Sequence, residues 1–78
     1  MSHAPDKVLD CIGLFCPMPI LKTREAIRGM AAGQLLEMRS DDPASEADMK
    51  SWTVRTGHEL LSIEKHGGVF SFVVRKAG

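Results

Sequence analysis

The apolar and polar positions of the chain follow two periods, and the points where the period changes mark out six elements. Alternation, the period of a half-buried strand, occurs in four stretches: 7–10, 34–40, 58–65 and 69–76. Apolar residues at three- and four-residue steps, the period of an amphipathic helix, occur from 17 to 30 or 31 and over 43–55. The pattern therefore predicts the element order βαβαββ.

Each predicted element has one apolar face, and these faces define the expected core. The first helix is expected to bury Ile20, Thr23, Ile27, Met30 and Ala31, and the second Met49, Trp52 and Val54, with Ala44 and Ala47. The strands are expected to contribute Leu36, Met38, Leu61, Ile63, Phe70, Phe72 and Val74. Gly33 and Gly57 are the expected helix stops, and 66–68 is the expected hairpin turn. Burying these faces together predicts a two-layer α/β sandwich, with two helices on one face of a four-stranded mixed sheet.

Both predicted helices begin at a proline. Asp42-Pro43 is an ordinary start, with Asp42 as N-cap residue and Pro43 at the first helical position. Cys16-Pro17-Met18-Pro19 has the same form, but a cysteine stands at the N-cap position.

This arrangement predicts a reactive thiol at Cys16. The positive end of the helix dipole would lie near its sulfur, with the amides of Met18 and Ile20 unpaired. A free thiol has a pKa of about 8.5, and helix N-termini can lower it to roughly 3.5–7.5. Gly13 lets the preceding connection turn sharply, while Pro17 and Pro19 fix the direction of the sulfur.

Composition limits the function classes. The chain has 78 residues, so we expect one domain over 1–78, with a loose tail over 1–6. Ten basic and ten acidic residues give zero net charge, which argues against non-specific nucleic-acid binding. No apolar run reaches membrane-spanning length, and the N-terminus lacks the features of a secretory signal, so we expect a cytoplasmic protein. No cofactor is indicated.

The remaining candidate side chains allow more than one interpretation. Cys11 is either a structural thiol or a redox partner of Cys16, and two cysteines are too few for a disulfide framework. His58 could form a Cys–His pair, although capping of the second helix or exposure to solvent explains it more simply. No metal site is expected, because the possible ligands lack workable spacing: Cys11, Cys16, His3, His58 and His66. Capping by Asp42 explains the Asp41-Asp42 pair better than acid–base chemistry.

The motifs now support a resemblance. Leu9-Asp10, Gly13-Leu14 and Cys16-Pro17-Met18-Pro19 resemble the signature of the TusA/SirA family of small sulfur-carrier proteins. Asp41-Asp42-Pro43-Ala44 and His58-Glu59-Leu60 are similar to two further landmarks of that family, so the resemblance extends from about Val8 to Lys76.

The resemblance implies a βαβαββ fold and a sulfurtransferase that carries sulfur as a persulfide on Cys16. Its partners would be sulfur-donor and sulfur-acceptor proteins, such as a cysteine desulfurase, a rhodanese or a DsrE-type protein. We expect a monomer without cofactor. Family members supply tRNA thiolation, molybdenum-cofactor assembly or dissimilatory sulfur oxidation. Candidate docking residues beside the motif are Phe15, Lys22, Arg24 and Arg28.

Two alternatives remain open at this stage. The chain could be a non-catalytic interaction or regulatory module in which Cys16 only caps a helix. It could also be a thiol–disulfide oxidoreductase that uses Cys11 and Cys16, although it has no C-x-x-C motif.

Overall fold

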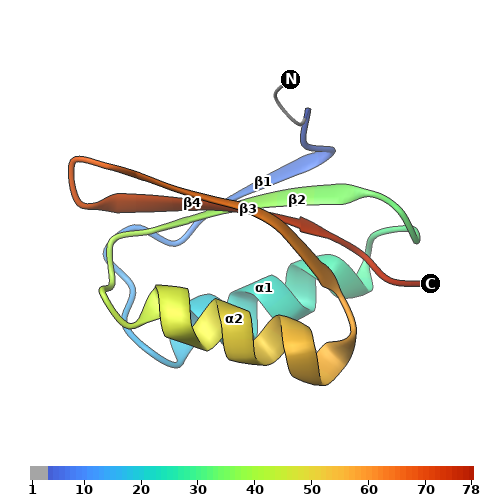
Figure 1. Cartoon of the computed structure of the whole chain (residues 1–78), viewed down its shortest axis with the longest axis horizontal. Coiled ribbons are helices and arrows are strands. Elements are labelled where there is room, and N and C mark those ends of the chain that lie inside the picture. The colour runs from blue at the N-terminus through green and yellow to red at the C-terminus, as the bar shows by residue number, and fades with distance from the viewer. Residues whose placement is uncertain (1–3) are drawn as a thin grey trace.

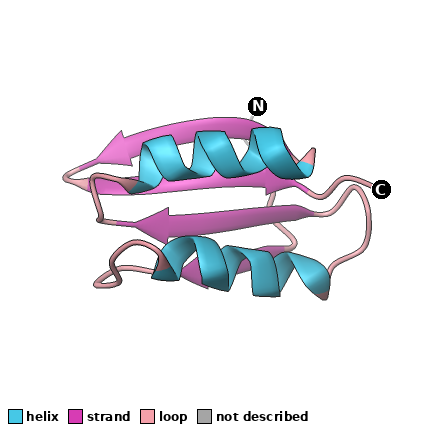
Figure 2. Ribbon diagram, turned by 90° about the horizontal axis from the view of Figure 1, so that it is seen from below, coloured by secondary structure: helices cyan, strands magenta, loops and turns pink. Residues whose placement is uncertain are grey.

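The computed structural model describes residues 4–78, so His3 and the first half of the predicted tail lie outside the described residues. Six elements follow in the predicted order (Figure 1): β1 (Lys7–Asp10), α1 (Met18–Arg28), β2 (Leu35–Ser40), α2 (Ser45–Thr56), β3 (Glu59–His66) and β4 (Val69–Arg75). Both helices lie on one face of the sheet, as Figure 2 shows from the helix side. The predicted two-layer α/β sandwich is confirmed.

The sheet is mixed, with the strand order β1-β2-β4-β3. β1 and β2 are parallel, because α1 carries the chain back across the sheet between them, whereas β4 pairs antiparallel with both β2 and β3. The β3–β4 hairpin turns through Gly67 and Gly68, which both have positive φ. β1 is an edge strand, and its C-terminal end leads directly into the loop that carries the cysteines.

The core lies between the sheet and the two helices. Leu36 and Met38 of β2 stand opposite Val74 and Phe72 of β4, and all four are fully buried. Met49 and Trp52 of α2 pack against this layer. A side chain of this size contributes about 1.5–3 kcal/mol when it is fully buried.

The first helix ends earlier than predicted. α1 stops at Arg28, and the amide of Met30 donates to Ile27 O at 3.0 Å, an i→i−3 bond that tightens the chain after the helix. The end at 30 or 31 is therefore wrong, and Ala31 is exposed, while Ala26 is buried instead. Gly33, the predicted stop, has a φ of +87° in the turn that precedes β2.

The second helix starts later than predicted and buries a different stripe. α2 begins at Ser45, with Ala44 as its N-cap residue. The assignment of Val54 to the core is wrong, because Val54 is 84% exposed. The helical period from Met49 leads to Thr53, which is buried and donates its hydroxyl to Met49 O at 2.9 Å. Ala44 and Ala47 are also exposed, whereas Gly57 ends the helix with a φ of +82°, as predicted.

A register shift in β3 changes the predicted inward face. The pairing with β4 is irregular between Leu60 and Ser62. Leu60 therefore stands opposite Val74, and Ile63 stands opposite Phe72. The prediction that Leu61 shares the inward face with Ile63 is wrong, because an irregularity of this kind reverses the alternation of side chains.

Candidate functional site

The candidate site is the loop from 11 to 17, which connects β1 to α1. Cys16 is exposed at the end of this loop, whereas Cys11 at its start is fully buried; both are free thiols. Large exposed apolar side chains occur in the same loop and in the first turn of α1, and we call them the apolar collar: Ile12, Phe15, Met18 and Leu21. Phe15 is 75% exposed, which is unusual for a large aromatic side chain.

The start of α1 differs from the prediction by one residue. Pro17, with φ −97° and ψ 10°, is the N-cap residue, and the peptide bond between Cys16 and Pro17 is cis. The predicted N-cap position of Cys16 is therefore wrong. The amide of Met18, which was expected to be free for the sulfur, donates to Phe15 O at 2.8 Å. Pro19 is buried against the core side of α1.

Two carboxylates from the loop before α2 hold the cysteine loop. The amide of Cys16 donates to Asp42 Oδ2 at 2.8 Å, and the amide of Gly13 donates to Asp41 Oδ1 at 2.9 Å. Asp42 Oδ1 also accepts the amide of Ala44 at 3.0 Å, so one carboxylate joins the starts of both helices. Gly13 has a φ of +87°, a conformation that glycine adopts without strain. The prediction that Asp42 is the N-cap residue of α2 is wrong, because Ala44 has that position. The sequence also did not predict this bridge, which spans 26 residues of the chain.

The electrostatics of Cys16 are opposite to those predicted. A side-chain hydrogen bond with Asp48 raises the pKa of the Cys16 thiol, and desolvation and the charges of Asp48 and Asp42 act in the same direction. The predicted stabilisation of the thiolate is therefore wrong for the free protein. Asp48 was missed by sequence reasoning because it belongs to α2, and no local spacing relates it to Cys16.

Cys11 lies in the core. Its amide donates to Arg39 O at 2.8 Å, which extends the β1–β2 pairing by one residue. Burial raises the pKa of the Cys11 thiol, and the charge of Asp10 adds to this, whereas Lys22 opposes it. These surroundings fit a structural thiol.

His58 lies at the other end of α2 from the cysteine loop. Its ring packs on Trp52 with centroids 5.2 Å apart, and its Nδ1 accepts the amide of Ala77 at 3.0 Å. Burial lowers the pKa of His58, and the charge of Lys76 acts in the same direction. α2 has 12 residues and is about 18 Å long, so the structure does not bring His58 to Cys16.

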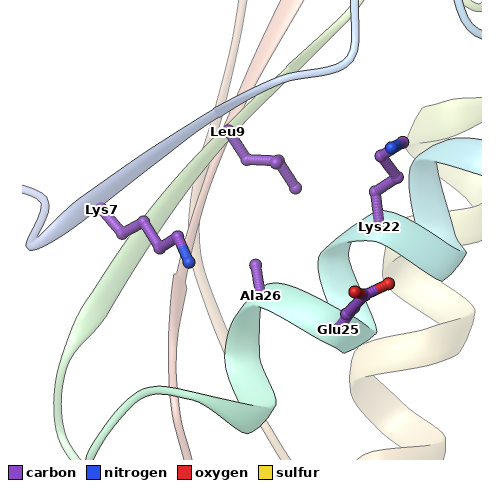
Figure 3. Close-up of a pocket in the computed structure, with 5 residues that line it drawn as sticks. All are labelled: Lys7, Leu9, Lys22, Glu25 and Ala26. Atoms are coloured by element: carbon purple, nitrogen blue, oxygen red, sulfur yellow. The ribbon is translucent and has the colours of Figure 1, made fainter.

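A groove lies between β1 and α1 on the same side of the molecule as the helices (Figure 3). Its volume is about 290 Å³, and it is lined by Lys7, Leu9, Lys22, Glu25 and Ala26. Leu9 and Ala26 supply its apolar surface.

The candidate docking cations do not form one cluster. Lys22 belongs to the groove, while Arg24 and Arg28 are four residues apart and share another face of α1. Over residues 4–78, no three His, Cys, Asp or Glu side chains stand close enough to bind a metal ion. No helix in the same range is long and apolar enough to cross a membrane.

Comparisons with known proteins agree with the motif and the fold. The family model described as sulfurtransferase TusA matches residues 7–76. The chain is 38% identical over 72 residues to the sulfur carrier protein TusA of Allochromatium vinosum. The aligned region covers 92% of this chain and 95% of that protein. It is 44% identical over 71 residues to YrkF of Bacillus subtilis (strain 168), but this covers 91% of the chain and only 38% of the longer YrkF.

A solved structure shows the same fold. The SirA-like protein of Desulfitobacterium hafniense superposes with a TM-score of 0.80 at 20% identity, over 92% of this chain and 99% of that one. The match to the family model and the identity to the Allochromatium vinosum protein confirm the resemblance inferred from the cysteine motif. From residues 7 to 76, the chain belongs to the sulfurtransferase TusA family of sulfur carriers.

Proposed function

We propose that Cys16 carries sulfur as a persulfide and relays it from a donor protein to an acceptor protein. The observation that carries the proposal is the contrast between the two thiols: Cys16 is exposed on a loop whose amides are held by Asp41 and Asp42, and Cys11 is buried. A relay needs a sulfur that another protein's cysteine can reach, and only Cys16 offers one.

The transfer consists of two exchange steps without net oxidation. The thiolate of Cys16 attacks the terminal sulfur of a donor persulfide, the S–S bond of the donor breaks, and the donor leaves as a thiolate. A cysteine of the acceptor then attacks the outer sulfur of Cys16–S–SH, and the Cys16 thiolate leaves. The chain is in this sense a sulfurtransferase that acts on proteins rather than on a free small substrate.

The partners are proposed by class. A cysteine desulfurase, a rhodanese or a DsrE-type protein would supply or receive the sulfur, within tRNA thiolation, molybdenum-cofactor assembly or dissimilatory sulfur oxidation. We propose that residues 1–78 act in the cytoplasm as one monomeric carrier domain. Phe15 would contact partners through the apolar collar, while Lys22, Arg24 and Arg28 would attract acidic surfaces.

The buried position of Cys11 supports the relay over a thiol–disulfide oxidoreductase. A disulfide between the two cysteines would need the sulfur of Cys11 to leave the core, where it is 0% exposed. A regulatory module without sulfur chemistry would not need an exposed, anchored thiol.

The test is the intact mass of the protein after incubation with a small persulfide donor. Wild type and Cys11→Ala should each gain one sulfur atom, and Cys16→Ala should gain none. Loading of Cys16→Ala would overturn the assignment. Absence of loading in wild type would favour the module.

A further inference from the structure

We propose that Asp41 is a positioning residue that pre-organises the cysteine loop for docking to a partner protein. The inference deepens the proposed function and rests on Cys16 as the residue that carries sulfur. It assigns a role to a side chain that lies outside the cysteine motif and acts through the backbone amide of Gly13.

Asp41 lies on a firmly held piece of backbone. It follows β2 directly and stands between Ser40 and Asp42, which are both buried. The amide of Asp42 donates to Ser40 Oγ at 3.2 Å, and Asp42 O accepts the amide of Ser45 at 3.0 Å and its hydroxyl at 2.6 Å. The backbone that carries the Asp41 side chain is therefore fixed to β2 on one side and to α2 on the other.

The stretch of the cysteine loop that Asp41 holds has little packing of its own. Gly13 has a φ of +87°, and apart from its chain neighbours no atom of residues 4–78 lies within 4 Å of the point where a Cβ would be. Leu14 packs only partly against the core, and its amide donates to Cys11 O at 3.1 Å, a bond local to the turn. The next residue, Phe15, is 75% exposed.

One hydrogen bond connects this stretch to the rest of the fold. The amide of Gly13 donates to Asp41 Oδ1 at 2.9 Å, across 28 residues of the chain. The two loops that it joins lie side by side at one end of the molecule (Figure 1). Without this bond, the backbone before Phe15 could rotate at a glycine, the residue with the greatest conformational freedom.

The consequence concerns the binding of a partner rather than the chemistry of the sulfur. A mobile loop has to be ordered when a partner docks on Phe15, and this ordering weakens binding. The amide of Cys16 is held separately by Asp42, so the sulfur keeps its place when the Asp41 bond is lost. Loss of the bond should therefore raise KM for a protein donor and leave kcat unchanged. Loading by a small persulfide donor, which needs only an exposed thiol, should also be unchanged.

The test compares four proteins: wild type, Asp41→Ala, Asp41→Asn and Asp6→Ala. The sulfur donor is a rhodanese in its persulfide form, which thiosulfate regenerates with release of sulfite, and the carrier concentration is varied. Asp41→Ala should raise KM for the carrier about three- to tenfold and leave kcat unchanged. Asp41→Asn keeps an acceptor oxygen and should match wild type. Asp6→Ala is the matched control and should also match wild type, because Asp6 Oδ2 accepts the exposed amide of Leu35 at 2.8 Å, a long-range bond of the same kind away from the cysteine loop.

A second measurement needs no partner. Hydrogen exchange of the Leu14 amide, followed by NMR, reports on the order of the loop, because this amide bonds to Cys11 O and not to Asp41. Its exchange should be faster in Asp41→Ala than in wild type, Asp41→Asn and Asp6→Ala. The bond to Gly13 is exposed, so its loss should leave the fold intact, and circular dichroism melts check this.

Four results would overturn the proposal: an unchanged KM in Asp41→Ala, an equal rise in Asp6→Ala, a rise in Asp41→Asn as large as that in Asp41→Ala, or unchanged exchange of the Leu14 amide in Asp41→Ala. The proposed function fails by a different result, the absence of loading of wild type by a small persulfide donor. In that case the exchange of the Leu14 amide still decides whether Asp41 orders the loop.

Discussion

The two cysteines lie five residues apart in the sequence, but their surroundings have little in common. Cys11 continues β1 into the core and is fully buried, with its amide bonded to β2. Cys16 is exposed, and its amide is bonded to Asp42, which precedes the second helix. The difference shows that the exposure of each thiol follows from its backbone, which continues the β1–β2 pairing at Cys11 and lies at the far end of the connecting loop at Cys16. The predictions below test this contrast, beginning with the largest expected effect.

Replacing each cysteine by alanine should separate sulfur chemistry from stability. Cys16→Ala should lose all sulfur transfer to an acceptor protein and keep a near-wild-type melting temperature, because its side chain packs little. Cys11→Ala should keep transfer but lose about 1 kcal/mol of unfolding free energy, because it leaves a small cavity in the core. Transfer assays and chemical denaturation measure the two quantities, and a loss of transfer in Cys11→Ala alone would contradict the contrast.

The two thiols should also differ in accessibility and in pH response. Iodoacetamide should modify Cys16 in the folded protein and reach Cys11 only after unfolding. Because Asp48 raises the pKa of the Cys16 thiol, its alkylation rate should still be increasing at about pH 8.5, the usual pKa of a free thiol. Peptide mass spectrometry after alkylation at several pH values measures both effects. A rate that levels off below about pH 8.5 would mean that the helix dipole outweighs the carboxylates.

Weakening the bridge at Asp42 should affect Cys16 and leave Cys11 buried. Asp42→Asn retains one carbonyl oxygen, so it cannot accept the amides of both Cys16 and Ala44. We expect a loss of about 1–3 kcal/mol in unfolding free energy and slower sulfur transfer. Asp10→Asn is the matched control. Within residues 4–78, the side chain of Asp10 accepts a hydrogen bond only from the exposed amide of Ile12, and the asparagine of the variant keeps a carbonyl oxygen for that bond. Equal effects of both variants would argue against a specific role for the bridge.

Replacing Pro19 should cost less unfolding free energy than weakening the bridge at Asp42. Pro19→Ala should cost about 1 kcal/mol, because it adds freedom to the unfolded chain and removes part of a buried side chain, and Pro17→Ala is made beside it. Both variants should fold, load sulfur from small donors and transfer it more slowly to a protein acceptor, because transfer depends on alignment. Pro43→Ala, before the other helix, is the control. Wild-type transfer rates in both variants would show that the prolines serve stability alone.

The sequence pattern was sufficient for the fold because the strands and helices follow their own periods closely. It failed at two places for different reasons. The register shift after Leu60 moves the inward face of β3, and no glycine or proline marks it in the sequence. In α2 the regular helical step from Met49 leads to Thr53 rather than Val54, but the polar hydroxyl of Thr53 hid its place on the buried face.

The site was predicted in part. The motif predicted a reactive cysteine and a sharp turn at Gly13; the structure shows that Cys16 is exposed and that Gly13 has a positive φ. The electrostatics could not be predicted, because the groups that act on Cys16 are Asp42 and Asp48, more than twenty residues away in the sequence. Only the packing of α2 against the cysteine loop brings them to the sulfur.

The most direct test of the account is the location of the added sulfur in the wild-type protein. After loading with a persulfide donor, remaining thiols and persulfides are trapped with an alkylating reagent, and the peptides are analysed by mass spectrometry. The account predicts one extra sulfur on the peptide that contains Cys16, which disappears after incubation with an acceptor thiol. Extra sulfur on Cys11, or an intramolecular disulfide between the two cysteines, would contradict it.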